Sequence, residues 1–207
     1  MNDLTKSWNS FSDEIAKKYL KTFGHPSTSS KELLVDVLEE LTRGTRPPSL
    51  IELGCGNAQI AEYFVEREFE CSYTGIDFSE VLLGAARQAV PGGTFIQDDV
   101  NTLTKVSGRY DIALYSHVLE LLTSPEESLA AAKRLADKIV IRFYEPPEFD
   151  IDSVELRWMD VGQKEQVPFI RRKMSRDYYR LILARIGCKN VDIYRDTTKD
   201  QVHVLTF

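Results

Sequence analysis

The chain has 207 residues, of which 43% are hydrophobic and 28% are charged, and its formal net charge is −6. This length and composition fit a single domain, residues 1–207, with a sizeable core. The acidic balance argues against a nucleic-acid partner, because neutralising phosphates needs a basic surface. No apolar stretch approaches the roughly 18 residues that span a membrane, and the first residues lack the pattern of a secretion signal. We therefore expect a cytoplasmic protein without a membrane or nucleic-acid partner.

Cysteine usage adds two further exclusions. Cys55, Cys71 and Cys188 are scattered along the chain, so neither a disulfide framework nor a zinc site is indicated. We therefore expect a reduced protein with no metal site.

The first 45 residues predict two helices that cap the domain. Apolar residues spaced near three and four predict an amphipathic helix over residues 8–22. A run of turn-forming residues then interrupts the pattern. Ser29 or Ser30 can cap a second helix, which ends near Gly44.

From residue 49 onward, apolar runs typical of strands alternate with helical patterns. Such alternation predicts right-handed βαβ crossovers and a parallel sheet with helices on both faces. Ser124 and Pro125 give a good helix start, with a serine cap and proline at the first position. The predicted strands are 49–53, 71–77, 93–97, 110–115 and 138–144. The predicted helices are 57–67, 79–89 and 125–136, with a poorly defined one near 101–107.

The C-terminal part departs from this alternation. Ser175 can cap a helix that Gly187 ends. Two strands, at about 190–195 and 201–207, then follow with no helix between them. They are too close for a crossover connection, so they should pair antiparallel.

A long connection over residues 145–174 separates the fifth strand from the last helix. It exceeds an ordinary loop, which indicates an insertion with a task of its own. Its aromatic and apolar residues with a few charges, Trp158 and Met159 among them, suit the wall of a small-molecule pocket. The alternatives are a lid or a dimer contact, and a homodimer is therefore one arrangement to test.

A glycine turn at the end of the first strand carries the strongest functional signal. Gly54 and Gly56 let the backbone approach a ligand, and Asp77 closes the next strand about twenty residues later. A dinucleotide fingerprint would need a third glycine, but Gln59 stands there. The extra carboxylate of Glu52 would repel a pyrophosphate and would suit a cation, such as a sulfonium with an α-amino group.

Four segments in order resemble the motifs of the class I S-adenosylmethionine-dependent methyltransferases. The resemblance covers roughly residues 30–207 and implies S-adenosylmethionine as cofactor, with S-adenosylhomocysteine as product. It implies a Rossmann-like, doubly wound α/β sheet of seven strands in the order 3-2-1-4-5-7-6, with the last strand antiparallel. The segments are 52–57 (ELGCGN), 73–79 (YTGIDFS), 95–100 (FIQDDV) and 110–120 (YDIALYSHVLE).

The resemblance implies roles for individual side chains. Asp77 would accept hydrogen bonds from both ribose hydroxyls, although capping the next helix is its alternative. Phe78 would pack on the adenine or in the core. Asp98 and Asp99 compete to accept a hydrogen bond from the adenine amino group, and the register of Asp99 with Val100 fits better. The full predicted cofactor set is Glu52, Gly54, Cys55, Gly56, Asp77, Phe78, Asp98, Asp99, Val100 and Ser116.

The end of the fourth strand, where the reactive methyl should lie, carries Tyr115, Ser116 and His117. Methyl transfer depends on positioning, and a general base helps when a hydroxyl must lose its proton. His117 suits that role by side-chain type, with a structural role as the alternative. We also expect Tyr115, Tyr144, Trp158 and Met159 to contact the acceptor.

These patterns together predict an enzyme that methylates an oxygen or nitrogen atom of a small molecule. An RNA or protein methyltransferase is one alternative, and the strand end lacks the Asn-Pro-Pro-Tyr motif of nucleic-acid amino methyltransferases. The other alternative is a homologue that keeps the cofactor site for another reaction or supports a catalytic partner. The sequence does not identify the acceptor.

Overall fold

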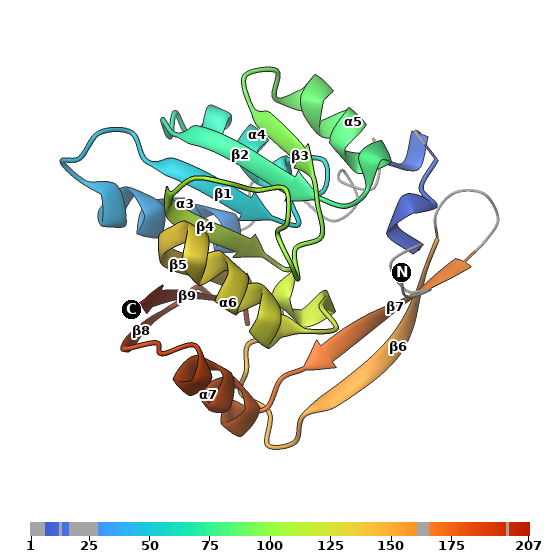
Figure 1. Cartoon of the computed structure of the whole chain (residues 1–207), viewed down its shortest axis with the longest axis vertical. Helices are drawn as coiled ribbons and strands as arrows, with labels where there is room; N and C mark the ends of the chain where they lie inside the picture. The colour runs from blue at the N-terminus through green and yellow to red at the C-terminus, as the bar shows by residue number, and fades with distance from the viewer. Residues whose placement is uncertain (1–6, 13, 17–28, 161–165, 198) are drawn as a thin grey trace.

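The computed structural model describes residues 7–12, 14–16, 29–160, 166–197 and 199–207. A twisted sheet runs through the middle of the molecule with helices on either side (Figure 1). The strands are β1 (Ser49–Leu53), β2 (Ser72–Asp77), β3 (Thr94–Gln97), β4 (Tyr110–Ser116), β5 (Ala136–Phe143), β6 (Ser153–Asp160), β7 (Gln166–Lys173), β8 (Asn190–Arg195) and β9 (Gln201–Thr206). The helices are η1 (Ser7–Asn9), α3 (Ser29–Thr42), α4 (Gln59–Glu66), α5 (Glu80–Ala89), η2 (Leu119–Leu121), α6 (Pro125–Leu135) and α7 (Arg176–Arg185).

The seven-stranded sheet has the order β3-β2-β1-β4-β5-β9-β8. Strands β1 to β5 pair in parallel, and β9 runs antiparallel to both β5 and β8. Because β8 and β9 are the sixth and seventh strands of this sheet along the chain, the predicted order 3-2-1-4-5-7-6 is confirmed. Parallel strands direct their carboxyl ends to one edge of a sheet, where ligands of such folds bind.

Both faces of the sheet are covered because the central strands are apolar on both sides. On one face Ile51 and Tyr115 belong to a buried cluster with residues of α6 and α7. On the other, Leu50 and Leu114 belong to a cluster with residues of α3 and α4. Complete burial of these side chains, at about 25 cal/mol per Å² of apolar surface, supplies the main driving force for folding.

Several predicted elements differ from the structure. The helix predicted near 101–107 is absent, because Asp98 accepts hydrogen bonds from Thr104 Oγ1 and Lys105 N and ties this stretch into a loop. The helix predicted over 8–22 is interrupted: η1 covers 7–9, residues 10–12 are not helical, and 14–16 are. Residues 17–22 of that prediction lie outside the described residues.

Two predicted caps also behave differently. Ser124 precedes α6 as predicted, with Pro125 at its first turn, but its side chain makes no capping hydrogen bond. The hydroxyl of Ser30 accepts hydrogen bonds from Arg142. By contrast, Ser175 accepts a hydrogen bond from Tyr178 N at the start of α7, and this predicted cap is confirmed.

The insertion folds as a hairpin that the sequence patterns did not reveal. Strands β6 and β7 pair antiparallel as a separate two-stranded sheet, which projects from the body at the lower right of Figure 1. Its inner face packs Met159 and Phe169 against Trp8 of η1 and Leu82 of α5. No helix in the described ranges is long and apolar enough to cross a membrane.

Candidate cofactor and acceptor site

The turn after β1 needs glycine at one position and leaves open space at another. Gly54 has φ +78, and a Cβ there would lie 2.7 Å from Val118 Cγ1. Its N–H donates to Ile76 O, which fixes the turn against β2. Gly56 has φ +56, and among the described residues no atom lies within 4 Å of the position that a Cβ would take, so its backbone faces open space there. A ligand can therefore approach the main chain at Gly56.

Asp77 lies at the carboxyl end of β2, beside this turn. One carboxylate oxygen accepts from Gly56 N at 3.0 Å, and the other accepts from Ser79 N at 2.9 Å. Burial raises the pKa of Asp77 to about 6, against the lowering effect of these two hydrogen bonds. Each carboxylate oxygen keeps a second lone-pair direction. Asp77 can therefore shape the turn and still accept hydrogen bonds from a ligand.

Glu52 is a buried carboxyl near the carboxyl end of β1. Tyr73 donates its hydroxyl hydrogen to Glu52 Oε2 at 2.5 Å. Burial raises the pKa of Glu52 to about 8, although the Tyr73 hydrogen bond and the nearby Arg142 act in the opposite direction. A carboxyl in this state is neutral at pH 7 and ionises readily when a cation comes close.

Asp98 and Asp99 have different surroundings. Asp98 is buried, and besides its two bonds to the 104–105 loop it accepts from Asp99 N at 2.8 Å. Asp99 is exposed, and its Oδ1 accepts from the backbone and side chain of Asn101. Asp98 therefore holds the loop, and Asp99 keeps more capacity to accept a hydrogen bond from a ligand.

The remaining members of the predicted cofactor set have mixed positions. Cys55 is buried, and its sulfur would lie 2.7 Å from a Cβ placed on Gly75, so close packing of β1 against β2 accounts for it. Phe78 is half-buried beside the site. Val100 is buried, and its carbonyl accepts from Ser128 Oγ.

The N-terminal segment reaches the glycine turn. Asn57 Nδ2 donates to Ala16 O at 3.2 Å, and Asn57 Oδ1 is buried without a partner among the described residues. This hydrogen bond places residues 14–16 beside the turn.

The three residues at the end of β4 point in different directions. Tyr115 is fully buried, and its hydroxyl lies 2.8 Å from Ser128 Oγ on α6. It belongs to the core, so the prediction that it contacts the acceptor is wrong. Ser116 Oγ accepts from Arg142 Nη1 at 3.0 Å. His117 stays partly open at the strand end, with 31% of its side chain exposed.

His117 has an unusual backbone and a carboxylate partner. Its φ is +58, a left-handed value that costs a residue with a side chain of order 1–3 kcal/mol. Its Nε2 lies 3.1 Å from Asp200 Oδ2, and its ring meets that of Tyr144 edge-on at 5.7 Å between centroids. Burial lowers the pKa of His117 to about 4, while the hydrogen bond to Asp200 acts in the opposite direction.

A buried arginine, which was not among the predicted site residues, organises this end of the sheet. Arg142 on β5 donates from Nε and Nη2 to Ser30 Oγ at 3.1 and 2.8 Å. Its Nη2 lies 3.9 Å from Asp200 Oδ2. The signal in the sequence was an arginine within the apolar run 139–143, next to the carboxyl end of a central strand.

Tyr144 lies between charged side chains on the acceptor side. Arg171 of β7 and Lys199 sit over its ring, 4.5 and 3.9 Å from the centroid. Both cations also face Glu145, at 3.1 and 3.8 Å. The hairpin therefore contacts Tyr144 through Arg171 of β7.

Glu120 is a buried carboxyl that contacts the backbone of Tyr144. Its Oε1 accepts from Tyr144 N at 2.8 Å, whereas its Oε2 is buried without a partner among the described residues. Burial raises the pKa of Glu120 to about 7. The carboxyl fixes the backbone that follows β5.

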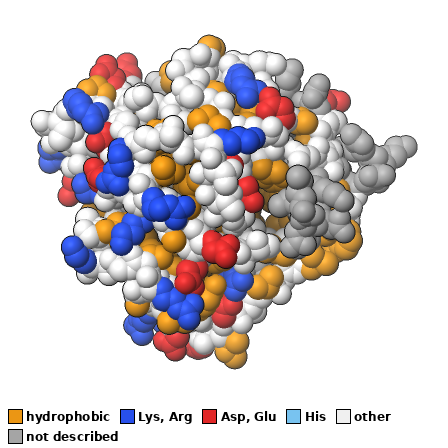
Figure 2. Space-filling model, in the orientation of Figure 1, with side chains coloured by type: hydrophobic (Ala, Val, Ile, Leu, Met, Phe, Trp, Pro, Cys, Tyr) orange, Lys and Arg blue, Asp and Glu red, His pale blue; other side chains and the backbone are white. Residues whose placement is uncertain are grey.

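Trp158 and Met159 do not form one wall, because neighbouring residues of a strand face opposite sides. Met159 is 7% exposed and packs on the inner face of the hairpin. Trp158 is 58% exposed on the outer face with Leu156 and Val154. Hydrophobic side chains accordingly line the lower right margin in Figure 2. The predicted contacts of Trp158 and Met159 with an acceptor stay predictions, but the two side chains cannot line the same face.

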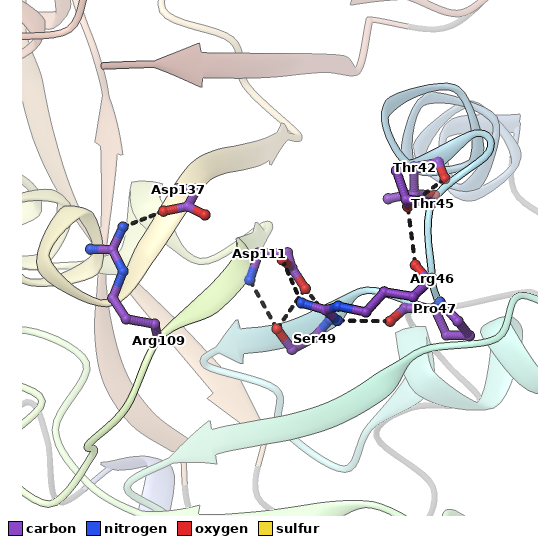
Figure 3. Close-up of polar contacts among 8 residues, drawn as sticks. All are labelled: Thr42, Thr45, Arg46, Pro47, Ser49, Arg109, Asp111 and Asp137. Atoms are coloured by element: carbon purple, nitrogen blue, oxygen red, sulfur yellow. Dashed lines mark hydrogen bonds and ion pairs between the residues drawn. The ribbon is translucent and has the colours of Figure 1, made fainter.

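The amino edge of the sheet carries a second polar cluster (Figure 3). Asp111 Oδ2 accepts from Ser49 N at 2.7 Å, and its Oδ1 accepts from Arg46 at 3.1 Å. The hydrogen bonds from Ser49 lower the pKa of Asp111. Nearby, Arg109 pairs with Asp137, both well exposed. A cavity of about 150 Å³ lies beside Arg46, Asp111 and Lys138.

Within the described ranges, no group of three or more His, Cys, Asp or Glu residues is placed to hold a metal ion.

Known proteins that resemble this chain include methyltransferases, both in sequence and in fold. Residues 50–138 match the family model described as a methyltransferase domain. The chain is 27% identical to a demethylmenaquinone methyltransferase of Chlamydia pneumoniae, over 62% of this chain and 57% of that protein. It is 25% identical to a trans-aconitate 2-methyltransferase of Yersinia pseudotuberculosis serotype O:1b, over 78% of this chain and 65% of that protein. The chain thus spans less than two thirds of the length of these relatives.

Solved structures share the fold. The CcbJ methyltransferase from Streptomyces caelestis superposes with a TM-score of 0.72 at 13% identity, over 100% of this chain and 99% of that chain. The DhpI–SAH complex gives a TM-score of 0.69 at 16% identity, over 98% and 96% of the two chains. The fold and the glycine turn are those expected of a class I methyltransferase domain, and residues 50–138 match a methyltransferase domain. Together with the relatives and the solved structures, this match supports the resemblance of the chain to the class I S-adenosylmethionine-dependent methyltransferases.

Proposed function

We propose that this protein transfers a methyl group from S-adenosylmethionine to an oxygen or nitrogen atom of a small molecule. The observation that carries the proposal is the backbone of Gly56, which is open among the described residues, together with two buried carboxyls that have raised pKa values, Glu52 and Asp77. Strongly perturbed groups that converge on one edge of a sheet are typical of a functional site.

Each part of the cofactor has a matching group in this site. Asp77 supplies acceptors for the ribose hydroxyls, and exposed Asp99 supplies one for the adenine amino group. Glu52 supplies a negative charge to a cationic amino-acid portion once its proton leaves. When bound, the cofactor supplies a methyl group on a positively charged sulfur. The residues of this chain orient it and exclude water.

A small-molecule acceptor is favoured by the site and by the relatives. His117, Tyr144 and Arg171 meet at the end of β4 and form a polar surface suited to a compact ligand. The two curated relatives are named for demethylmenaquinone and trans-aconitate, which are both small molecules. The net charge of −6 disfavours RNA as the acceptor. A cytoplasmic location and a homodimer stay predictions from the sequence.

The cofactor assignment is tested by calorimetry with S-adenosylhomocysteine. We expect measurable binding by the wild type and a loss of at least about 30-fold, roughly 2 kcal/mol, for Asp77→Asn, because two charge-assisted hydrogen bonds weaken. Asp111→Asn is the matched control, since Asp111 also accepts backbone and hydroxyl hydrogen bonds but at the opposite edge. Equal affinity for wild type and Asp77→Asn would remove Asp77 from the site.

The reaction is tested by incubating the protein with S-adenosylmethionine and separate panels of hydroxyl compounds and amines. Release of S-adenosylhomocysteine above the acceptor-free rate is the expected result. Tight cofactor binding with no release on any panel would instead support a homologue that keeps the site for another reaction.

A further inference from the structure

Asp200 joins His117 to a buried polar network, although 83 residues separate them in the sequence. The Asp200 side chain is only 10% exposed. Burial acts to raise its pKa, but hydrogen bonds from His117 and Ser30 outweigh this, and the pKa lies below the usual value. Asp200 is therefore an ionised carboxylate that accepts hydrogen from the His117 ring.

An ionised carboxylate fixes which nitrogen of the histidine carries hydrogen. Because Asp200 can only accept, the hydrogen lies on Nε2, and Nδ1 presents a lone pair. Nδ1 has no hydrogen-bond partner within the part of the chain that the structure describes. The side chain is nonetheless 31% exposed at the strand end where the acceptor should lie.

We propose that Asp200 is a positioning residue for His117 and that His117 Nδ1 takes the proton from a hydroxyl acceptor. This inference rests on the proposed function and narrows it to oxygen methylation. The acceptor oxygen loses its proton to Nδ1 and forms a bond to the methyl carbon. The electron pair of the broken carbon–sulfur bond stays on sulfur, which becomes a neutral thioether. The imidazolium stays next to the Asp200 carboxylate until it returns its proton to water.

The backbone of His117 supports this assignment independently. Its left-handed φ of +58 is retained although it is costly for histidine, and its N–H donates to Arg142 O at 2.9 Å. Strain at a strand end is typical of residues held for function. Here it turns the ring toward Asp200 and Tyr144.

Charged groups around His117 keep it neutral at working pH. Burial is the largest effect on its pKa and lowers it; Arg142 from β5 and Lys31 from α3 lower it further, and Asp200 raises it. Two further cations, Lys199 and Arg171, lie over the ring of Tyr144, which contacts the His117 ring. The neutral imidazole therefore keeps its Nδ1 lone pair from about pH 5 upward.

The geometry is tested first by long-range proton–nitrogen NMR on the whole protein, without any acceptor. The chain has three histidines, so His117→Gln and His203→Gln assign the signals. We expect the Nε2–H form of His117 at pH 7, and a fall of at least about one unit in its pKa in Asp200→Asn. The Nδ1–H form, or an unchanged pKa in Asp200→Asn, would overturn the pairing.

The role in catalysis is tested with the hydroxyl panel and S-adenosylmethionine. We expect His117→Gln to lower kcat about 100-fold and Asp200→Asn about tenfold, with S-adenosylhomocysteine affinity within about twofold of wild type. Raising the pH to about 9–10 should partly restore His117→Gln, because the acceptor then ionises without a base. If the kcat of His117→Gln stays equally far below the wild-type value at every pH, His117 has a structural role and the proposal is contradicted.

Three outcomes separate this inference from the proposed function. Turnover on hydroxyl compounds that is unchanged in both variants overturns the His117–Asp200 role alone. Turnover restricted to amines also overturns it, while methyl transfer stands. Absence of both cofactor binding and turnover in the wild type overturns the proposed function, and the catalytic role falls with it.

Discussion

The two edges of the central sheet carry similar residue types in opposite environments. At the amino edge, Arg46 and Asp111 pair in partly exposed positions, with 69% and 36% of their side chains accessible. At the carboxyl edge, Glu52 and Arg142 are only 2% and 4% exposed. At the amino edge, hydrogen bonds from Ser49 lower the pKa of Asp111. At the carboxyl edge, burial raises the pKa of Glu52 to about 8.

The difference shows why a list of charged residues does not locate a site. Exposed ion pairs are stabilised by local partners and water, and each contributes about 0–1 kcal/mol. Buried groups keep perturbed pKa values, so their protonation changes when a charged ligand arrives. Variants at the two edges of the sheet should therefore differ in their effects on stability and on cofactor binding.

Gly54→Ala should give the largest effect, because a Cβ would meet Val118 at 2.7 Å in a left-handed conformation. We expect a loss of about 2–4 kcal/mol in the free energy of unfolding and no measurable binding of S-adenosylhomocysteine. Gly44→Ala is the matched control at the amino edge: its φ is +75, but nothing among the described residues lies within 4 Å of the added atom. Gly44→Ala should therefore cost about 1 kcal/mol for the φ value alone and leave binding unchanged. Denaturant unfolding and calorimetry measure both, and equal costs would contradict the close approach at Gly54.

Glu52→Gln should abolish a pH dependence of cofactor binding. With a pKa of about 8, Glu52 must lose a proton to meet a cationic amino group. Wild-type affinity for S-adenosylhomocysteine should therefore rise roughly tenfold from about pH 6.5 to 8, with proton release on binding. Calorimetry in buffers of different ionisation enthalpy measures both quantities. Asp111→Asn should show the same change of affinity with pH as the wild type. If the wild-type affinity did not change with pH, cofactor binding would not be coupled to the ionisation of Glu52.

His203→Gln should reduce sensitivity to acid. His203 is 1% exposed, its two nitrogens lie near Tyr179 Oη and Gln201 Oε1, and burial lowers its pKa to about 4. The pKa of His203 in the folded protein lies below the value of about 6.5 that a histidine has in the unfolded chain. Between these two values the unfolded chain binds more protons, so the free energy of unfolding falls as the pH drops from about 6.5 toward 4. The wild type should lose about 2 kcal/mol between about pH 7.5 and 5 from this group. Thermal unfolding at both pH values should show a smaller difference for the variant; equal differences would assign the acid sensitivity elsewhere.

Arg46→Ala should have the smallest effect. The ion pair with Asp111 is exposed, so its removal should change the free energy of unfolding by about 0.5 kcal/mol or less. S-adenosylhomocysteine affinity should not change, because Arg46 lies at the amino edge. A tenfold change in affinity would show that the two edges are coupled.

Much of the fold followed from local patterns. The strands at 49–53, 190–195 and 201–207 were predicted at or near their observed bounds, because apolar periodicity and turn residues carry that information locally. The order of the strands in the sheet was implied by the resemblance to the methyltransferases and is confirmed. The helix near 101–107 failed because the side chain of Asp98 competes for backbone N–H groups there. The hairpin β6–β7 was not predicted, because the insertion was interpreted as a pocket wall, a lid or a dimer contact without assigning strands to it.

The amino-acid pattern was enough to predict the parallel sheet, the glycine turn at Gly54–Gly56 and the carboxylates that end the first strands. These features depend on neighbours within a few residues and on a regular strand spacing. The three-dimensional arrangement was needed to show that Tyr115 lies in the core, that Met159 and Trp158 face opposite sides, and that Asp200 contacts His117. Arg142 and Ser30 are 112 residues apart. Such pairs leave no local pattern, because they form only when strands from distant parts of the chain end at the same edge.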